Sequence, residues 1–110
     1  QLLSNLMSNP EGVIFVSEVG GEVVGFLAGA IQPSIISHTK IAIELAWFVN
    51  KRARGAAMAI KLVESFEGWA EDNGAEWVTM SDIPSISDLA PLYSKLGYSL
   101  TEKAYSKRVI

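Results

Sequence analysis

One stretch, residues 41–73, most constrains how this chain can fold. Residues 41–49 are almost wholly apolar and too short for a helix of ordinary length, which predicts a buried strand. From Ala57 to Asn73 the apolar residues recur at helical spacing. A strand that leads through a short turn into a helix places unpaired backbone N–H groups and the positive end of the helix dipole at the turn. We therefore expect an anion site there.

The turn itself carries residues that suit an anion site. Lys51, Arg52 and Arg54 supply positive charge, and residues 50–61 contain no acid. Gly55 lets the backbone approach a ligand closely. Because the chain as a whole carries a net charge of −3, this local basic patch favours a compact polyanion and argues against a general nucleic-acid binder.

Two strand-like runs precede this unit. Val13–Val19 and Glu22–Ile31 are separated by Gly20-Gly21, and such a pair predicts a hairpin because both turn positions can take a positive φ. Gly25 and Gly29, inside the second run, indicate a bulge or a close backbone approach.

The segments after the central helix extend the sheet. Gly74 supplies a helix C-cap, and residues 76–80 form a short strand. Strand, helix and strand in this order predict a right-handed crossover with parallel neighbouring strands, whose carboxyl ends flank the anion site. A further helix follows, capped by Ser87 or Asp88 and ended by Gly97.

The two ends of the chain have weaker patterns. Residues 1–8 have helical spacing and predict the tail of a helix, whereas residues 98–100 and 104–109 predict a terminal antiparallel pair. We expect one domain over residues 1–110, in a cytoplasmic protein with no membrane span. We also expect no metal site, because the chain has one His and no Cys.

Two motifs resemble a known family. Val49 to Ala59 resembles the acyl-CoA-binding motif of the GNAT superfamily of N-acetyltransferases, Gln/Arg-x-x-Gly-x-Gly/Ala. Both Arg52-x-x-Gly55-x-Ala57 and Arg54-x-x-Ala57-x-Ala59 fit that motif. Residues 90–98, Ala-Pro-Leu-Tyr-Ser-Lys-Leu-Gly-Tyr, resemble the family's Phe/Tyr-Tyr-x-Lys-x-Gly-Phe/Tyr. With the order of elements between them, the resemblance covers residues 13–109 and lacks the family's first strand and most of its first two helices.

The resemblance implies an α/β fold of GNAT type. Its sheet would be mixed and mostly antiparallel, with a central parallel pair splayed around an acyl-CoA site and helices on both faces. The cofactor would be acetyl-CoA, with its pyrophosphate on backbone N–H groups at the helix start and its pantetheine arm on the central strand. The implied cofactor-binding residues are Trp47, Phe48, Val49, Arg52, Arg54, Gly55, Ala56, Ala57, Met58 and Ala59.

The resemblance also implies transfer of an acetyl group to a small-molecule or peptide amine. An alkylammonium with a pKa of about 10.4 must lose a proton before it attacks. Glu44, the only acid between Glu22 and Glu64, is our candidate base; otherwise it is an exposed strand residue. Tyr93 would protonate, or hydrogen-bond to, the departing thiolate; otherwise it is a core aromatic.

Two other classes remain open at this point. One is a non-catalytic GNAT-like module that binds CoA or a protein partner, and a homodimer is possible in either case. The other is a nucleotide-binding domain, although the chain has no Gly-x-Gly-x-x-Gly after a strand and no Gly-Lys-Ser/Thr.

Overall fold

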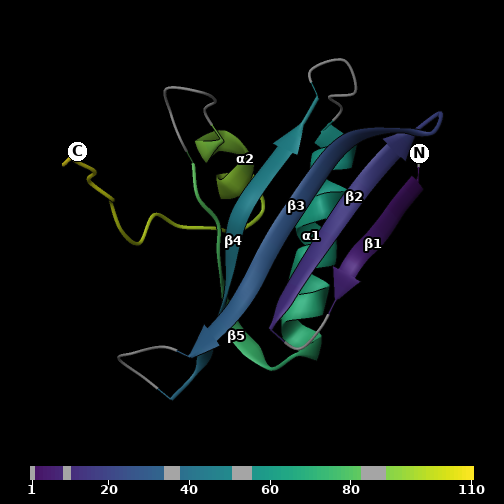
Figure 1. The fold of residues 1–110 in the computed structure, drawn as a ribbon. Helices are drawn as coiled ribbons and strands as arrows, with labels where there is room; N and C mark the ends of the chain where they lie inside the picture. The colour runs from purple at the N-terminus through teal and green to yellow at the C-terminus, as the bar shows by residue number, and fades with distance from the viewer. Residues whose placement is uncertain (1, 9–10, 34–37, 51–55, 83–88) are drawn as a thin grey trace.

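The computed structural model describes residues 2–8, 11–33, 38–50, 56–82 and 89–110 (Figure 1). Five strands form one sheet in the order β1-β2-β3-β4-β5. Neighbours pair antiparallel except β4 and β5, which are parallel. This confirms the predicted mixed, mostly antiparallel sheet with a parallel pair. The elements are β1 (Leu2–Ser8), β2 (Gly12–Val19), β3 (Glu22–Pro33), β4 (Lys40–Val49), α1 (Ala56–Asp72), β5 (Ala75–Thr79) and α2 (Ala90–Lys95).

Glycines set the predicted boundaries. Gly20 and Gly21, with φ of 59° and 83°, form the turn between β2 and β3, which confirms the hairpin. Gly74 and Gly97 also have positive φ, and they follow the ends of α1 and α2. The N-cap of α2 is Leu89, and the predicted caps at positions 87 and 88 lie outside the described residues.

Both predictions at the chain ends were wrong. Residues 2–8 form β1, which pairs antiparallel with β2, because an open sheet edge can override a short helical pattern. Residues 98–110 have no regular secondary structure, and 99–110 are all exposed. A two-stranded hairpin is marginal without a sheet or helix to pack on, which accounts for the absence of the expected terminal pair.

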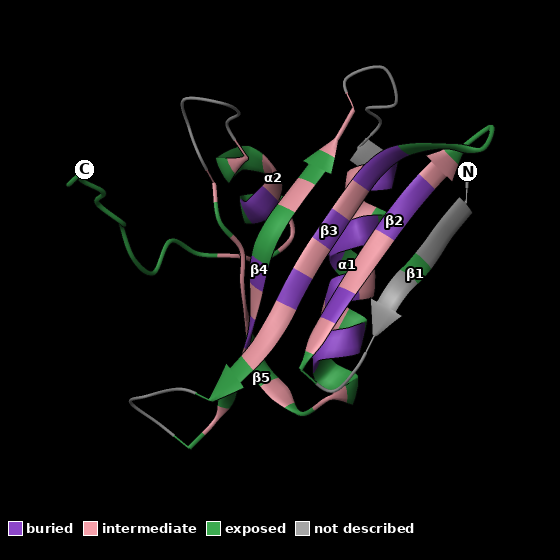
Figure 2. Ribbon diagram, viewed as in Figure 1, coloured by how far each residue is buried: buried purple, intermediate pink, exposed green. Residues whose placement is uncertain are grey.

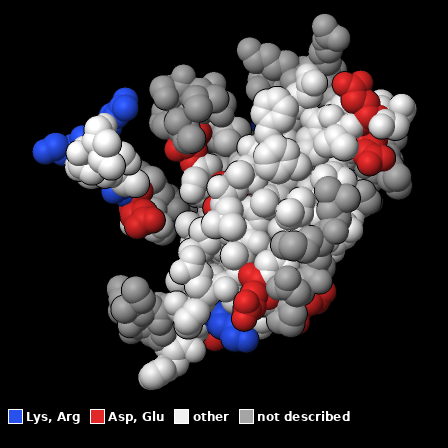
Figure 3. All heavy atoms as spheres, in the orientation of Figure 1, with Lys and Arg blue, Asp and Glu red and all other residues white. Residues whose placement is uncertain are grey.

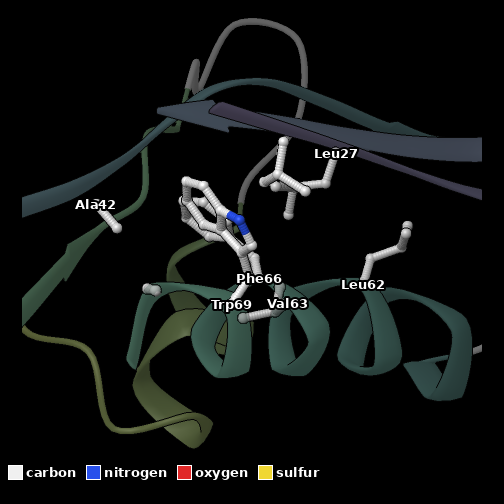
Figure 4. Packing of buried hydrophobic residues seen from close by; sticks show 8 residues of the cluster. Leu27, Ala42, Leu62, Val63, Phe66 and Trp69 are labelled. Carbon is white, nitrogen blue, oxygen red and sulfur yellow. The ribbon is translucent and has the colours of Figure 1, made fainter. Parts of the chain in front are cut away.

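The core lies between the sheet and α1 (Figures 2 and 4). Phe66 and Trp69 stack with ring centroids 5.9 Å apart and pack toward β2, β3 and β4, which confirms their predicted place in the core. Burial of a side chain of this size stabilises the fold by about 1.5–3 kcal/mol. The fully or almost fully buried cluster comprises Val13, Leu27, Ala42, Leu62, Val63, Phe66, Trp69 and Ala70.

The helices lie on one side of this sheet. α1 runs behind β2 and β3 in Figure 1, and Leu96 and Tyr98, just after α2, pack against the same core. The described residues place no helix on the opposite face, where the resemblance led us to expect one. Neither α1, with 17 residues, nor the shorter α2 is long and apolar enough to span a membrane, and the described part of the chain has no other helix.

Gly29 is needed because α1 approaches β3 closely. A Cβ at this position would lie 2.2 Å from Cε1 of Phe66, whose ring is fully buried. Gly29→Ala should therefore lower the free energy of unfolding by about 1–3 kcal/mol through overpacking. Chemical denaturation measures the change. Gly68→Ala is the matched control, because its Cβ would contact nothing and should stabilise α1 by about 1 kcal/mol. Equal stability of Gly29→Ala and wild type would contradict this packing.

Candidate active site

The two parallel strands part in the middle of β4. Their pairing runs from Lys40 with Ala75 to Ile43 with Thr79. β4 continues to Val49, and in the described structure these later residues pair with β3 alone. A gap in strand pairing therefore opens on the β5 side of β4, on the way to the start of α1, as the expected splay requires.

A β-bulge lies where the strands part. Gly29 pairs with Glu44 and Ala28 pairs with Ala46, so Leu45 is an extra residue on β4. In a regular strand Glu44 and Trp47 would point to opposite faces, because side chains alternate. The extra residue places Glu44 and Trp47 on the same face, and both side chains point to the side of the sheet that α1 and α2 cover.

Three hydrogen bonds join Glu44, Ser81, Tyr93 and Trp47, which we call the Ser81 cluster. The backbone N–H of Ser81 donates to Oε1 of Glu44 at 2.9 Å. The hydroxyl of Tyr93 donates to the backbone oxygen of Ser81 at 2.6 Å. The indole N–H of Trp47 donates to that hydroxyl at 3.0 Å. The path starts and ends on β4, and it ties that strand to the chain just after β5 and to α2.

Burial is the main influence on the pKa values of the two titratable groups in the cluster, Glu44 and Tyr93. Glu44 is 6% exposed, and burial raises the pKa of its carboxyl, an effect that the Ser81 N–H partly offsets. The pKa of Tyr93 rises to about 12 because the hydroxyl is buried, with further contributions from the charges of Glu44 and Asp82 and an opposing one from the Trp47 N–H. Tyr93 is therefore neutral at physiological pH, and Glu44 is a stronger base than an exposed carboxylate.

The structure brings the two predicted catalytic residues, Glu44 and Tyr93, into one cluster. Glu44 is buried, so the alternative of an exposed strand residue does not hold. Tyr93 is buried as well, and its ring lies 5.7 Å from that of Tyr98 while its hydroxyl enters the cluster.

The predicted cofactor-binding residues lie around this cluster and at the start of α1. Trp47 points into the cluster, Phe48 is exposed and Val49 is half-buried. Met58 is buried, so only its main chain could meet a ligand. Ala56 begins α1, Ala57 is exposed and Ala59 is half-buried. Arg52, Arg54 and Gly55 lie outside the described residues, so the two motif registers stay open.

The start of α1 suits a phosphate group. The helix is 17 residues long and has no acid in its first turn, so its positive end is not neutralised from within. Ala57 is small and exposed there, which leaves room near the first backbone N–H groups.

The described residues contain no cluster of three or more His, Cys, Asp or Glu that could hold a metal ion.

Sequence reasoning missed Ser81 and the side chain of Trp47. Ser81 directly follows the predicted strand 76–80. Because ligands bind at the carboxyl ends of parallel strands, this position could have identified Ser81 as a site residue. Trp47 was expected to contribute only its main chain. Its role depends on the bulge at Leu45, for which the run Ile41–Val49 gives no sign.

Solved structures of acetyltransferases share this fold. An aminoglycoside acetyltransferase from an uncultured soil metagenomic sample has a TM-score of 0.79 and 22% identity, over 96% of this chain and 70% of that one. The aminoglycoside N-acetyltransferase AAC(6')-Iy in complex with CoA has a TM-score of 0.79 and 17% identity, over 91% and 77%. Glucosamine-6-phosphate N-acetyltransferase from Arabidopsis thaliana has a TM-score of 0.77 and 22% identity, over 90% and 67%.

Sequence comparison is more specific about the family than these fold matches are. No curated protein matches the chain. The model of the Acetyltransferase (GNAT) family, however, matches residues 1–98, most of the chain, and includes both motifs and the whole Ser81 cluster. The chain therefore belongs to the Acetyltransferase (GNAT) family.

Proposed function

We propose that this protein transfers an acetyl group from acetyl-CoA to an amine by direct attack. The observation that carries the proposal is the Ser81 cluster, which holds a buried carboxylate and a tyrosine hydroxyl at the point where β4 and β5 part. The acceptor is a small molecule or a peptide with a primary amine. Similar folds that act on aminoglycosides and on glucosamine-6-phosphate support a small-molecule acceptor.

The cofactor would lie between the parted strands and the start of α1. Its phosphates would bind the first backbone N–H groups of α1, from Ala56 to Ala59, with Arg52 or Arg54 adding charge-assisted bonds. The main chain of residues 47–49 would hold the pantetheine arm, since β4 there has β3 as its paired strand. Bound acetyl-CoA supplies a thioester carbonyl that an amine can attack. The complex of a similar fold with CoA supports this cofactor.

Glu44 would accept the proton that the attacking amine loses. Its Oε1 accepts the Ser81 N–H, so Oε2 is the atom that would take the proton, directly or through one water. As the nitrogen bonds to the acetyl carbon, the carbon–sulfur bond breaks and the electron pair leaves on sulfur. The raised pKa of Glu44 brings the base closer to the operating pH.

Tyr93 would stabilise the departing sulfur by hydrogen bonding. A thiol has a pKa of about 8.5, whereas that of Tyr93 is about 12. Complete transfer of the proton from oxygen to sulfur would therefore cost about 5 kcal/mol. The hydroxyl already donates to the oxygen of Ser81, so in the reaction it would redirect or share that proton.

Turnover of acetyl-CoA against a panel of amines tests the proposal. Because the chain has no Cys, every thiol that appears in the assay comes from CoA, and a thiol reagent can follow the reaction continuously. We expect CoA release in step with acetylated amine measured by mass spectrometry. Binding of CoA with no turnover on any amine would leave the non-catalytic module as the better description.

A negative charge introduced at the start of α1 should weaken cofactor binding without destabilising the fold. Ala57→Glu places a carboxylate where the phosphates should bind, so we expect CoA affinity to fall at least tenfold, about 1.4 kcal/mol. The same charge favours the helix dipole, so stability should not fall. Calorimetry and thermal melts measure the two effects. Ala57→Gln is the matched neutral control. Equal CoA affinity in all three proteins would exclude this phosphate site.

A further inference from the structure

The helix that carries Tyr93 is too short to hold its own orientation. α2 has six residues, and an isolated helix of fewer than about 12 residues is marginal in water. Its position therefore depends on bonds to other elements. At its start, the backbone N–H of Leu89 donates to Oδ2 of Asp82, just after β5, at 3.2 Å. The other end of α2 needs a tie as well, and Tyr98 provides it.

The tie at the end of α2 is a hydrogen bond to α1. The hydroxyl of Tyr98 donates to Oε2 of Glu67, in the second half of α1, at 2.7 Å. Glu67 is half-buried, whereas the other acids of α1, Glu64, Glu71 and Asp72, are exposed. Figure 3 likewise shows most of the visible Asp and Glu side chains at the margins of the molecule, where water solvates them. Glu67 thus differs from the other acids of its helix in being partly removed from water and bound to a tyrosine.

Tyr98 is tied to Tyr93 in two ways. Gly97, with a φ of 90°, turns the chain back over the end of α2, so that the backbone N–H of Tyr98 donates to the backbone oxygen of Tyr93 at 2.9 Å. The rings of the two tyrosines also meet, with centroids 5.7 Å apart and planes tilted by 51°. A displacement of Tyr98 would therefore move both the backbone and the ring of Tyr93.

The bond between Tyr98 and Glu67 is suited to hold this arrangement. Burial, followed by the hydrogen bond and the charge of Glu67, raises the pKa of Tyr98 well above its usual value, so the hydroxyl keeps its proton and remains a donor. A hydrogen bond to a carboxylate is about twice as strong as one between neutral groups. The Ser81 cluster does not include Tyr98, so an effect of this bond on the reaction passes through Tyr93.

We propose that the Tyr98–Glu67 bond positions the hydroxyl of Tyr93 against the departing sulfur, so that Tyr98 and Glu67 are positioning residues for acetyl transfer. The inference rests on the function proposed above for Tyr93. The start of α1 would hold the phosphates of the cofactor, and the same helix holds Tyr98 through Glu67. The bond thus fixes the tyrosine relative to the helix that would bind the cofactor. Because a misplacement of about 1 Å can cost about 10²-fold in rate, such a tie matters for turnover.

Steady-state kinetics of single variants measure the effect of the bond. Tyr98→Phe keeps the ring contact and removes only the hydroxyl, and we expect it to lower kcat about tenfold with CoA affinity unchanged. Glu67→Ala should have the same effect, whereas Glu67→Gln, whose amide oxygen can still accept the bond, should retain most of the activity. Glu71→Ala is the matched control, because it removes an exposed acid one turn further along α1 and should leave kcat unchanged.

The double variant Tyr93→Phe/Tyr98→Phe distinguishes positioning from a general loss of stability. Once the Tyr93 hydroxyl is gone, loss of the Tyr98 hydroxyl should lower kcat no further, because the two residues act on the same step. An equal loss of kcat in both backgrounds, or wild-type kcat in Tyr98→Phe, overturns the proposal.

The indole N–H resonance of Trp47 tests the same bond without an activity assay. This group donates to the Tyr93 hydroxyl at 3.0 Å, so its chemical shift in an NMR spectrum reports where the hydroxyl lies. We expect Tyr98→Phe and Glu67→Ala to move the resonance toward its position in Tyr93→Phe, whereas Glu67→Gln leaves it in place. The indole of Trp77, 64% exposed on β5, is the internal reference. A Trp47 resonance that moves in neither variant overturns the proposal.

The two readouts also separate this proposal from the proposed function. Acetylation of no amine would refute the function and, with it, the positioning role in acetyl transfer. Normal turnover together with an unmoved Trp47 resonance would refute the positioning role alone and leave the function standing.

Discussion

Tyr93→Phe is expected to lower kcat by about 10²–10³-fold with CoA affinity nearly unchanged. The substitution keeps the ring and removes the phenolic hydroxyl, which donates to the backbone oxygen of Ser81 beside the parted strands. The loss should be smaller with an acyl donor whose leaving group needs no hydrogen bond. Because burial raises the pKa of Tyr93 to about 12, ionisation of Tyr93 should not affect the pH profile of the wild type near neutral pH. Single-turnover kinetics with acetyl-CoA measure the chemical step.

The same substitution should also cost stability. It leaves the indole N–H of Trp47 and the backbone oxygen of Ser81 without the partner they share. Because Trp47 is half-buried and Ser81 is exposed, water can replace part of these bonds, and the loss should be about 1 kcal/mol. Trp47→Phe separates the two effects, since it removes the donor to Tyr93 but leaves the hydroxyl and its bond to Ser81 in place. We expect Trp47→Phe to retain most of the activity. Wild-type kcat in Tyr93→Phe, where chemistry limits the rate, would make Tyr93 a structural residue.

Local signals in the sequence were sufficient for the centre of the fold. The apolar run of β4, the spacing along α1 and the glycines at the β2–β3 turn each specify one element, and the crossover rule then fixes β4 and β5 as parallel neighbours. Glu44 could be nominated because it is the only acid between Glu22 and Glu64 and lies on the central strand, and Tyr93 because it lies in the second motif. The motifs added the family, which periodicity could not supply.

Features that depend on tertiary pairing were not predictable in this way. The bulge at Leu45 comes from the register of β4 against β3, and without it Trp47 would not face Tyr93. Residues 2–8 have a helical pattern, but the edge of β2 pairs with them as β1. Residues 98–110 are strand-like in sequence but have no partner strand within the described chain, so propensity alone does not make them a strand.

Glu44→Gln is expected to lower turnover by about 10²–10⁴-fold, the range typical of a general base, while CoA affinity stays close to that of the wild type. Glutamine keeps the shape of the side chain and an oxygen that can accept the Ser81 N–H, so the geometry of the cluster should persist. The defect should shrink as the pH approaches the pKa of the amine, about 10.4, because the free amine then needs no base. A loss that does not depend on pH would assign Glu44 a structural role.

Stability should respond to Glu44→Gln in the opposite direction. Burial raises the pKa of Glu44 above 4.5 in the folded state, so ionisation of this carboxyl favours the unfolded chain. The stabilising contribution of the neutral form is fully present below the unfolded pKa of about 4.5 and is lost as the pH rises through the folded value. Glu44→Gln should therefore be more stable than the wild type at pH 7 and lose that advantage at pH 4, as denaturant titrations at both values would show. A variant less stable than the wild type at pH 7 would mean that the bond from Ser81 to the carboxylate outweighs the cost of burying its charge.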